Sequence, residues 1–218
     1  MNAPSPLRRS SAFTLIELLI TVSVIAILAA LVMPGVNSMI DSSRSATCAS
    51  NLRHIGQALF SYANENDGTL PAADIQGQWP TGTYMHRINP YLENLPTVTF
   101  QEQLRALYGG IFHCPGKRDY NLYGGPTDRQ RTCYAMNTFD LNNVPATGKK
   151  LVQIENRIRT ILVADTETGY WALRNGHYMN KDFRAIRHKK QFDNILFCDG
   201  HVELIANKVV PYELVLED

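Results

Sequence analysis

One carboxylate interrupts a long stretch of this 218-residue sequence that has no other charged side chain. Glu17 is the fifth residue of an otherwise apolar run at residues 13–33. A charge at the centre of a bilayer costs roughly 2.5–3.5 kcal/mol on insertion scales, so the presence of Glu17 in this run needs an explanation. The run meets the roughly 20 residues that a helix needs to cross a ~30 Å hydrocarbon core. Arg8 and Arg9 precede it and the next basic residue is Arg44, so the positive-inside rule places the N-terminus in the cytoplasm.

Histidine and aspartate side chains near the C-terminus form a second candidate site. His188, Asp199 and His201, with His177 as a further ligand, supply the imidazole and carboxylate groups that zinc binds. Calcium is the other candidate ion, because it takes carboxylate and carbonyl oxygens. The simpler interpretation, which we favour, is that Asp199-Gly200 forms a hairpin turn and that His201 is a strand residue.

The four cysteines form a third group, Cys48, Cys114, Cys133 and Cys198. They would lie outside the cytoplasm in this topology, where disulfides persist. Four cysteines allow three pairings, and the sequence does not choose among them. A Cys48–Cys114 bridge would attach a loop region to a helix and leave Cys133 and Cys198 as the second pair. His113, Cys114 and Cys133 also suggest a nucleophile and base, but no activating pattern surrounds them.

Asp165 and Glu167 resemble a carboxylate pair for acid–base catalysis, although an acidic loop after a strand is the commoner explanation. The sequence contains no serine nucleophile elbow, phosphate-binding loop or paired-cysteine zinc spacing. We therefore expect a protein without enzymatic activity. The formal net charge is +1 and no dense basic tract occurs, which argues against a nucleic-acid partner.

A single long helix is expected to position the N-terminal residues. The apolar residues Val36, Met39 and Ile40 continue the helical stripe beyond Pro34 and Gly35, and from Cys48 to Tyr62 the stripe recurs at intervals of four and three residues. The pattern predicts one helix over residues 13 to about 64, apolar all round in its first half and amphipathic in its second. The amphipathic half is expected to pack on a globular head.

The remainder of the chain is typical of an α+β head. Residues 65–150 are rich in loop-forming residues, with short helices expected at 84–92 and 101–107. Strands are expected at 157–164 and 209–216. Residues 194–198 and 201–205 flank Asp199-Gly200, which predicts a hairpin with a type I′ turn.

The order Ala12-Phe13-Thr14-Leu15-Ile16-Glu17-Leu18 after a short basic leader resembles the type IV prepilin signal, which is found in pilins and in the pseudopilins of type II secretion. The resemblance implies that a prepilin peptidase cleaves between Ala12 and Phe13 and methylates the new amine. It also implies that Glu17 pairs with the Phe13 amine of a neighbouring subunit, which removes the desolvation problem. The family usually has glycine where this chain has Ala12, and a small residue still fits.

Cys48-Ala49-Ser50-Asn51-Leu52-Arg53-His54-Ile55-Gly56 resembles the helix of large pseudopilin-like proteins from planctomycetes, verrucomicrobia and lentisphaerae. Their C-terminal signature is a histidine, nine residues and Asp-Gly, whereas ten residues separate His188 from Asp199 here. We expect the extra residue to lie in the loop 189–193, which makes a direct contact between His188 and Asp199 doubtful. The resemblance adds weight to calcium, although the calcium-ligand pattern of major pseudopilins is not recognisable here. The motifs Phe112-His113-Cys114-Pro115, Tyr134-Ala135-Met136-Asn137 and Asp199-Gly200-His201-Val202 fit the same group.

Together these patterns predict a leader at residues 1–12, a transmembrane or filament-core helix at 13–33, its amphipathic continuation at 34–64 and a pilin-like α+β head at 65–218. The head is expected to be a small antiparallel sheet on which the helix packs. The expected function is that of a structural subunit of a type II secretion pseudopilus or related type IV filament. No cofactor is expected, and a calcium ion is the possible exception.

Such a subunit would begin in the bacterial inner membrane with a cytoplasmic N-terminus and a periplasmic head, and would then enter the filament. Its expected partners are a prepilin peptidase, other copies of itself or related pseudopilins, and an inner-membrane assembly platform. Two alternatives stay open. One is a membrane-anchored module that binds a glycan or metal without assembling, and the other is a hydrolase that uses Asp165 and Glu167. A plain anchor or a secretory signal cut near Ala29-Ala30 fits the N-terminus less well.

Overall fold

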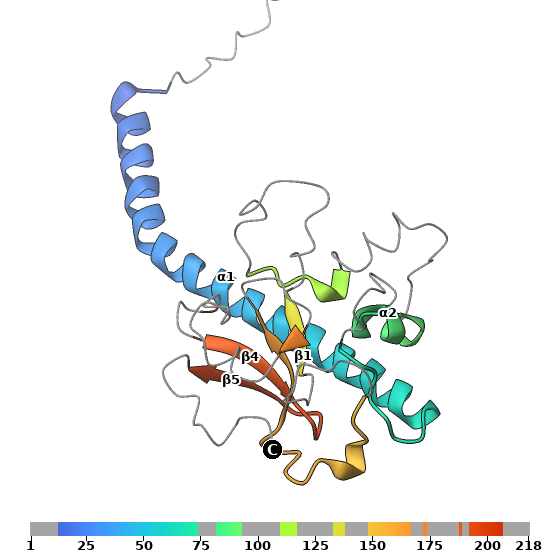
Figure 1. Cartoon of the computed structure of the whole chain (residues 1–218). Helices are drawn as coiled ribbons and strands as arrows, with labels where there is room; N and C mark the ends of the chain where they lie inside the picture. The colour runs from blue at the N-terminus through green and yellow to red at the C-terminus, as the bar shows by residue number, and fades with distance from the viewer. Residues whose placement is uncertain are drawn as a thin grey trace, which may run out of the picture. The chain divides into compact units, whose positions relative to one another are not determined.

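The computed structural model divides the chain into two units, Met1–Ile40 and Asp41–Asp218. Helix α1 (Leu15–Glu65) runs through the boundary between them, in agreement with the single helix expected over residues 13–64 (Figure 1). The structure describes residues 13–73, 82–92, 110–116, 133–137, 148–166, 172–173, 188 and 192–206.

The part of α1 in the first unit is apolar and exposed. Among the described residues, α1 is the one helix that is long and apolar enough to cross a membrane by length and composition. Large side chains such as Leu15, Leu31 and Met33 have more than two thirds of their surface exposed (82%, 74% and 69%). An apolar surface of this extent requires a lipid or protein environment, because soluble monomers rarely expose large contiguous apolar patches.

The part of α1 in the second unit buries one face. Cys48, Leu52, Ile55 and Leu59 are fully buried, whereas Arg53 on the opposite face is exposed. The helical spacing from Cys48 therefore predicted the buried face correctly. The same stripe was extended back to Val36, Met39 and Ile40, and these are exposed because they precede the second unit.

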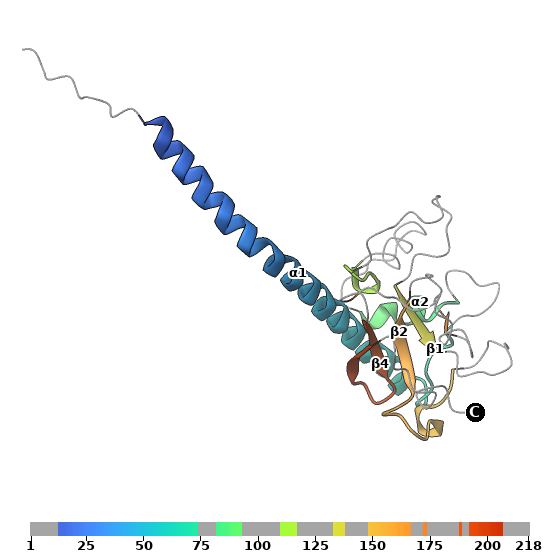
Figure 2. The ribbon, with the colours of Figure 1, turned by 90° about the vertical axis from the view of Figure 1, so that its left-hand side faces the viewer.

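Within the described residues, the second unit contains a five-stranded sheet with the order β3-β1-β2-β4-β5. Neighbouring strands are antiparallel except β3, which pairs in parallel with β1. Figure 2 shows β1, β2 and β4 side by side. The strands are β1 (Tyr134–Asn137), β2 (Ile161–Asp165), β3 (Ala172–Leu173), β4 (Phe192–Phe197) and β5 (Val202–Ala206).

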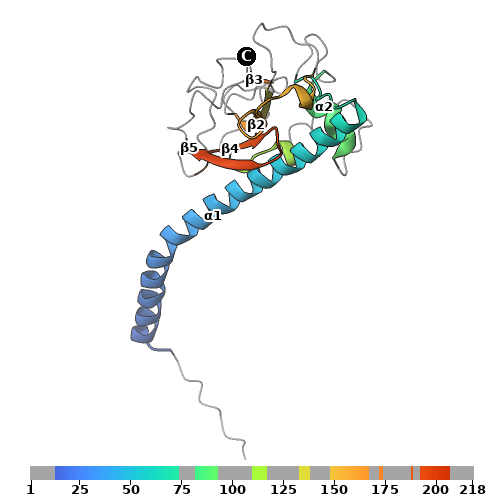
Figure 3. The same cartoon turned by 90° about the horizontal axis from the view of Figure 1, so that it is seen from below.

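One face of this sheet packs against α1. Leu162 of β2 and Leu196 of β4 share a core cluster with Leu52 and Leu59 of α1, and Figure 3 shows the helix alongside the strands. Gly56 permits the close approach, because a Cβ atom there would lie 3.1 Å from the Leu196 side chain. A long helix on a mainly antiparallel sheet is the expected α+β, pilin-like fold. The strand expected at 157–164 begins only at Ile161, because residues 157–159 form a turn.

The short helix expected at 84–92 is present as α2 (Tyr84–Ile88) followed by the 3-10 helix η1 (Asn89–Tyr91). Thr83 caps α2, because its hydroxyl oxygen accepts the His86 N–H at 3.4 Å. The helix expected at 101–107 and the strand expected at 209–216 lie outside the described residues. Two further 3-10 helices are η2 (Gly110–Phe112) and η3 (Leu151–Gln153).

The β4–β5 hairpin is confirmed, but its turn differs from the expected type I′ turn. The Phe197 carbonyl accepts the Gly200 N–H at 3.0 Å, and the Phe197 N–H donates to the His201 carbonyl at 2.9 Å. Gly200 has φ 96°, whereas Asp199 is not among the residues with positive φ. A type I′ turn needs positive φ at both central residues, so this connection is a three-residue loop with glycine at the bulge.

Replacing Gly200 by alanine should lower the free energy of unfolding by about 1–2 kcal/mol, because an L-residue is strained at this φ. The new Cβ would also lie 3.1 Å from the Phe60 ring. Thermal melts should show a decrease of roughly 2–8 °C in Tm. Gly200→Asn should cost less, because asparagine tolerates positive φ better. An unchanged Tm for Gly200→Ala would contradict this account of the turn.

A buried tyrosine makes stability depend on alkaline pH. Tyr84 is fully buried and its hydroxyl donates to the Tyr134 carbonyl at 3.1 Å. Burial, with a smaller contribution from the charge of Cys133, raises the pKa of Tyr84 far above its usual value. The folded chain therefore keeps this proton at a pH where the unfolded chain releases it. Its contribution to stability is complete below pH 10 and is lost as the pH rises further.

Tyr84→Phe should therefore make the loss of stability above pH 10 shallower, by up to about 1.4 kcal/mol per pH unit. At neutral pH the variant should be less stable by about 0.5–1.5 kcal/mol, because one hydrogen bond is lost. Urea unfolding between pH 7 and pH 11 measures both effects, with the half-buried Tyr62 replaced by phenylalanine as the control. Identical pH profiles for the wild type and Tyr84→Phe would contradict the assignment.

Candidate functional site

The candidate processing and assembly site lies at the start of α1. Thr14 precedes the first helical residue, and its hydroxyl oxygen accepts the Glu17 N–H at 3.4 Å. The Glu17 carboxylate in turn accepts the Thr14 N–H and the Thr14 hydroxyl proton, both at 2.9 Å. This reciprocal arrangement is a capping box, which satisfies two amides that a helix start leaves without partners.

The capping role of Glu17 was not predicted, although the sequence contains its usual signal, Thr-x-x-Glu before an apolar run. The box supplies hydrogen bonds but no positive charge, so the carboxylate still lacks a counter-charge within this short segment. Phe13, directly before the cap, is 77% exposed, and Glu17 is exposed as well. The side chain can therefore meet a cation from another molecule without breaking the helix. Ala12, on the other side of the expected cleavage point, lies outside the described residues.

Residues 7–33 match the prokaryotic N-terminal methylation motif. This motif includes the expected cleavage point, Glu17 and the apolar run. The match supports a type IV pilin-like or pseudopilin-like precursor that a prepilin peptidase processes. Together with the apolar helix, it supports a membrane-anchored protein. Neither the curated proteins nor the solved structures include a match to this chain. The resemblance of the remaining chain to the planctomycete group therefore stays a prediction.

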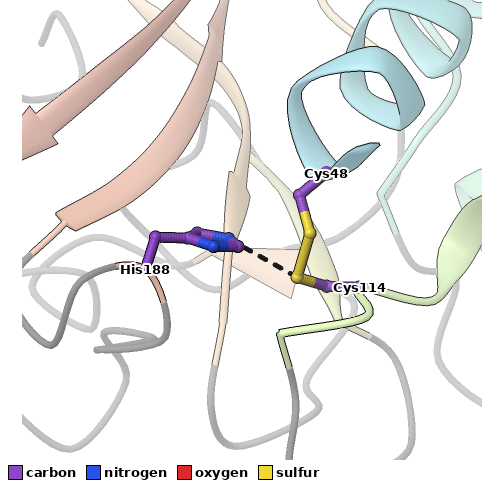
Figure 4. Close-up of side chains that lie close together, drawn as sticks. All are labelled: Cys48, Cys114 and His188. Carbon is purple, nitrogen blue, oxygen red and sulfur yellow. Dashed lines mark hydrogen bonds between the residues drawn. A yellow bond between two sulfur atoms is a disulfide. The ribbon is translucent and has the colours of Figure 1, made fainter. Parts of the chain in front are cut away.

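The second unit contains a disulfide between Cys48 of α1 and Cys114, which follows η2 (Figure 4). The two Cα atoms are 5.3 Å apart, within the range that disulfides require. Asn51, one turn after Cys48, donates to the His113 carbonyl at 3.0 Å and holds the same loop. The bridge therefore attaches the loop region to the helix, as expected for a Cys48–Cys114 pairing. It also removes the Cys114 thiol from the suggested nucleophile–base pair.

The second suggested pairing, Cys133 with Cys198, is wrong. Both residues are buried thiols without a disulfide, and they lie near opposite ends of β2. The Cys133 carbonyl accepts the Thr166 N–H, whereas the Cys198 N–H donates to the Thr160 carbonyl. Thr160 and Thr166 are roughly 20 Å apart along extended chain at about 3.3 Å per residue. Disulfides require Cα separations below about 7 Å.

The suggested metal site of His188, Asp199 and His201 is also wrong. His188 pairs with Phe192 at the start of β4, whereas Asp199 and His201 lie beyond Phe197 at its end. Five residue steps of a strand, roughly 17 Å, separate these positions. Asp199 Oδ1 instead lies 2.6 Å from His201 Nδ1 on the partly exposed hairpin loop. The hairpin explanation of Asp199 was therefore the better one. His177 lies outside the described residues.

His188 instead lies in a buried cluster that was not predicted from the sequence. Its Nε2 atom is 3.5 Å from Cys114 Sγ and 3.3 Å from Asp165 Oδ2. All three residues are at most 1% exposed. Asp165 is the last residue of β2 and accepts the Asn194 N–H at 3.3 Å, so the expectation of an acidic loop after the strand is wrong for this residue. Glu167 lies outside the described residues.

Proposed function

We propose that this chain is a structural subunit of a type II secretion pseudopilus or a related type IV filament. The observation that carries the proposal is the position of Glu17, a carboxylate on an exposed, otherwise apolar helix start within the methylation motif. In a simple membrane anchor this carboxylate would serve no function and would make insertion less favourable, because a charge in lipid is costly. In a filament subunit the carboxylate can pair with a positive charge of the neighbouring subunit in the filament core.

The first stage of the proposed cycle is membrane insertion. The apolar first half of α1 holds the precursor in the inner membrane, with Arg8 and Arg9 on the cytoplasmic side and the second unit in the periplasm. A prepilin peptidase then removes residues 1–12 and methylates the Phe13 amine. Thr14 becomes the second residue of the mature chain, so its capping box starts the helix directly after the new terminus.

The second stage is assembly. The methylated Phe13 amine retains a positive charge, and cleavage places it close to the start of a neighbouring helix. A pair between this amine and Glu17 of the neighbour lowers the cost of burying both charges in the filament core. The exposed apolar side chains of α1 are covered by other helices in the same step. An inner-membrane assembly platform supplies the subunits.

The test is co-expression of the full chain with a prepilin peptidase and a filament assembly machinery. We expect peptidase-dependent removal of residues 1–12 and recovery of the chain in sedimentable filaments. Ala12→Leu should block cleavage, whereas Ala12→Gly should preserve it, because the position before the cut requires a small residue. A processed chain that stays dispersed in the membrane under these conditions would contradict the proposal and favour the anchored binding module.

A further inference from the structure

Three buried side chains bring metal-binding atoms close together in the second unit, and a buried carboxylate contacts one of them. Cys48 Sγ, Cys114 Sγ and a His188 ring nitrogen all lie within 4.8 Å of one another (Figure 4). Asp165 Oδ2 is 3.3 Å from the same imidazole Nε2 that faces Cys114. Cys48, Cys114 and Asp165 are 0% exposed and His188 is 1% exposed. Two sulfurs, from α1 and from the loop after η2, therefore converge with one nitrogen of His188. The Asp165 carboxylate at the end of β2 contacts that same nitrogen.

Two of the spacings in this cluster fit a tetrahedral metal ion. Zinc binds histidine nitrogen and carboxylate oxygen at about 2.0–2.2 Å and cysteine sulfur at about 2.3 Å. Ligand atoms around such an ion are therefore separated by roughly 3.3–3.8 Å. Two separations in the cluster match this range, 3.5 Å from Cys114 Sγ to His188 Nε2 and 3.3 Å from His188 Nε2 to Asp165 Oδ2. The two sulfurs are bonded to each other in the disulfide and can move apart once it is reduced.

A catalytic relay would need a different arrangement. In a nucleophile–histidine–carboxylate triad, the nucleophile and the carboxylate contact opposite nitrogens of the imidazole ring. Here the sulfur and the carboxylate both face Nε2, and within the described part of the chain His188 Nδ1 has no hydrogen-bond partner. Groups that share one nitrogen cannot pass a proton across the ring. Nε2 is also the ring nitrogen that would bind an ion placed beside the two sulfurs.

We propose that Cys48, Cys114, His188 and Asp165 bind Zn²⁺ when the two cysteines are reduced. The disulfide and the zinc ion are alternative occupants of one site, because disulfide sulfurs are not the thiolates that zinc binds. A phosphine with water converts the disulfide to two thiols and becomes the phosphine oxide. Each thiol then releases its proton as the ion binds. Two thiolates, one imidazole and one carboxylate form a donor set suited to zinc, and zinc does not oxidise thiols.

Zinc would replace the covalent link between α1 and the loop after η2 with a non-covalent one. The second unit would then keep this attachment before its disulfide forms or after the disulfide is reduced. The inference does not depend on filament assembly, because the site lies entirely in the second unit, whereas Glu17 belongs to the first. Failure of zinc binding would leave the proposed function unaffected.

The test uses the full-length chain in detergent, with and without a phosphine reductant. Each sample receives Zn²⁺, excess metal is removed by gel filtration, and bound zinc is measured by elemental mass spectrometry. We expect about one zinc ion per reduced chain and almost none per oxidised chain. Co²⁺ in place of Zn²⁺ should give the sulfur-to-cobalt charge-transfer band and the intense visible bands of a tetrahedral thiolate site. A reduced, folded chain that binds neither ion would overturn the proposal.

His188→Gln should weaken binding at least as much as the roughly 10–100-fold that loss of a ligand's hydrogen-bond partner costs. His201→Gln is the matched control, because His201 lies on the hairpin loop and contacts Asp199 outside the cluster. Circular dichroism of the oxidised variants shows whether each one folds. Equal zinc affinity in the folded His188→Gln variant and the wild type would overturn the assignment. If His188→Gln does not fold, the wild-type cobalt spectrum decides, because its charge-transfer band requires thiolate ligands.

Discussion

Glu17→Ala should abolish filament assembly while leaving membrane insertion intact. Removing the carboxylate makes the apolar segment easier to insert, because a charge at the centre of a membrane helix costs roughly 2.5–3.5 kcal/mol. Assembly fails because the Phe13 amine of the neighbour then enters the filament core without a counter-charge. Removing one partner of a buried ion pair costs about 3–5 kcal/mol, so assembled chain should fall on the order of 100-fold or more. Quantitative blotting of sheared filaments against membrane fractions measures this effect.

Two further substitutions separate the charge of Glu17 from its role in the capping box. Glu17→Gln keeps an oxygen that can accept the Thr14 N–H but has no charge. Glu17→Asp keeps the charge on a shorter side chain. We expect Glu17→Gln to fail as completely as Glu17→Ala, and Glu17→Asp to retain part of the assembly. Normal filaments from Glu17→Gln would show that capping matters and that charge pairing does not.

The double substitution Cys48→Ala with Cys114→Ala should lower the free energy of unfolding by about 4 kcal/mol. The disulfide links residues that are 66 positions apart in the sequence. In the chain-entropy model, a loop of this size gives a stabilisation between about 3 and 4.7 kcal/mol. At roughly 2–4 °C per kcal/mol, Tm should fall by about 8–16 °C. Calorimetry of the detergent-solubilised chain in the presence of a chelator measures the change.

Reduction provides the control for this stability measurement. A phosphine with a chelator should lower the Tm of the wild type by a similar amount and leave the double variant unchanged. Replacing the chelator with Zn²⁺ should restore part of the lost stability in the reduced wild type but not in the double variant. Equal stability of the oxidised wild type and the double variant would contradict the stabilising role of the bridge.

The elements that depend on local pattern were predictable from the sequence. The spacing from Cys48 to Leu59 predicted the buried face of α1, and Asp199-Gly200 between apolar runs predicted the β4–β5 hairpin. The turn type was wrong because the sequence does not show that only Gly200 needs positive φ. The buried stripe was extended too far because periodicity does not show where the second unit begins.

The buried cluster was not predictable, because it depends on tertiary structure. Asp165 follows an apolar strand and looks like the start of a surface loop, yet His188 and the Asn194 amide cover it. Neither residue is near Asp165 in the sequence. The pairing of cysteines depends on the same topology, since β2 lies between the positions of Cys133 and Cys198. Composition and spacing contain no information about this strand order.

The intact mass of the chain isolated from native membranes and sheared filaments tests the central claim most directly. The account predicts a chain that begins at N-methylated Phe13, in the filament fraction as well as in the membrane. Peptide mass spectrometry of the N-terminus locates the added methyl group. A chain that retains Met1 in both fractions would contradict processing, and one that begins near residues 32–35 would show secretory cleavage instead.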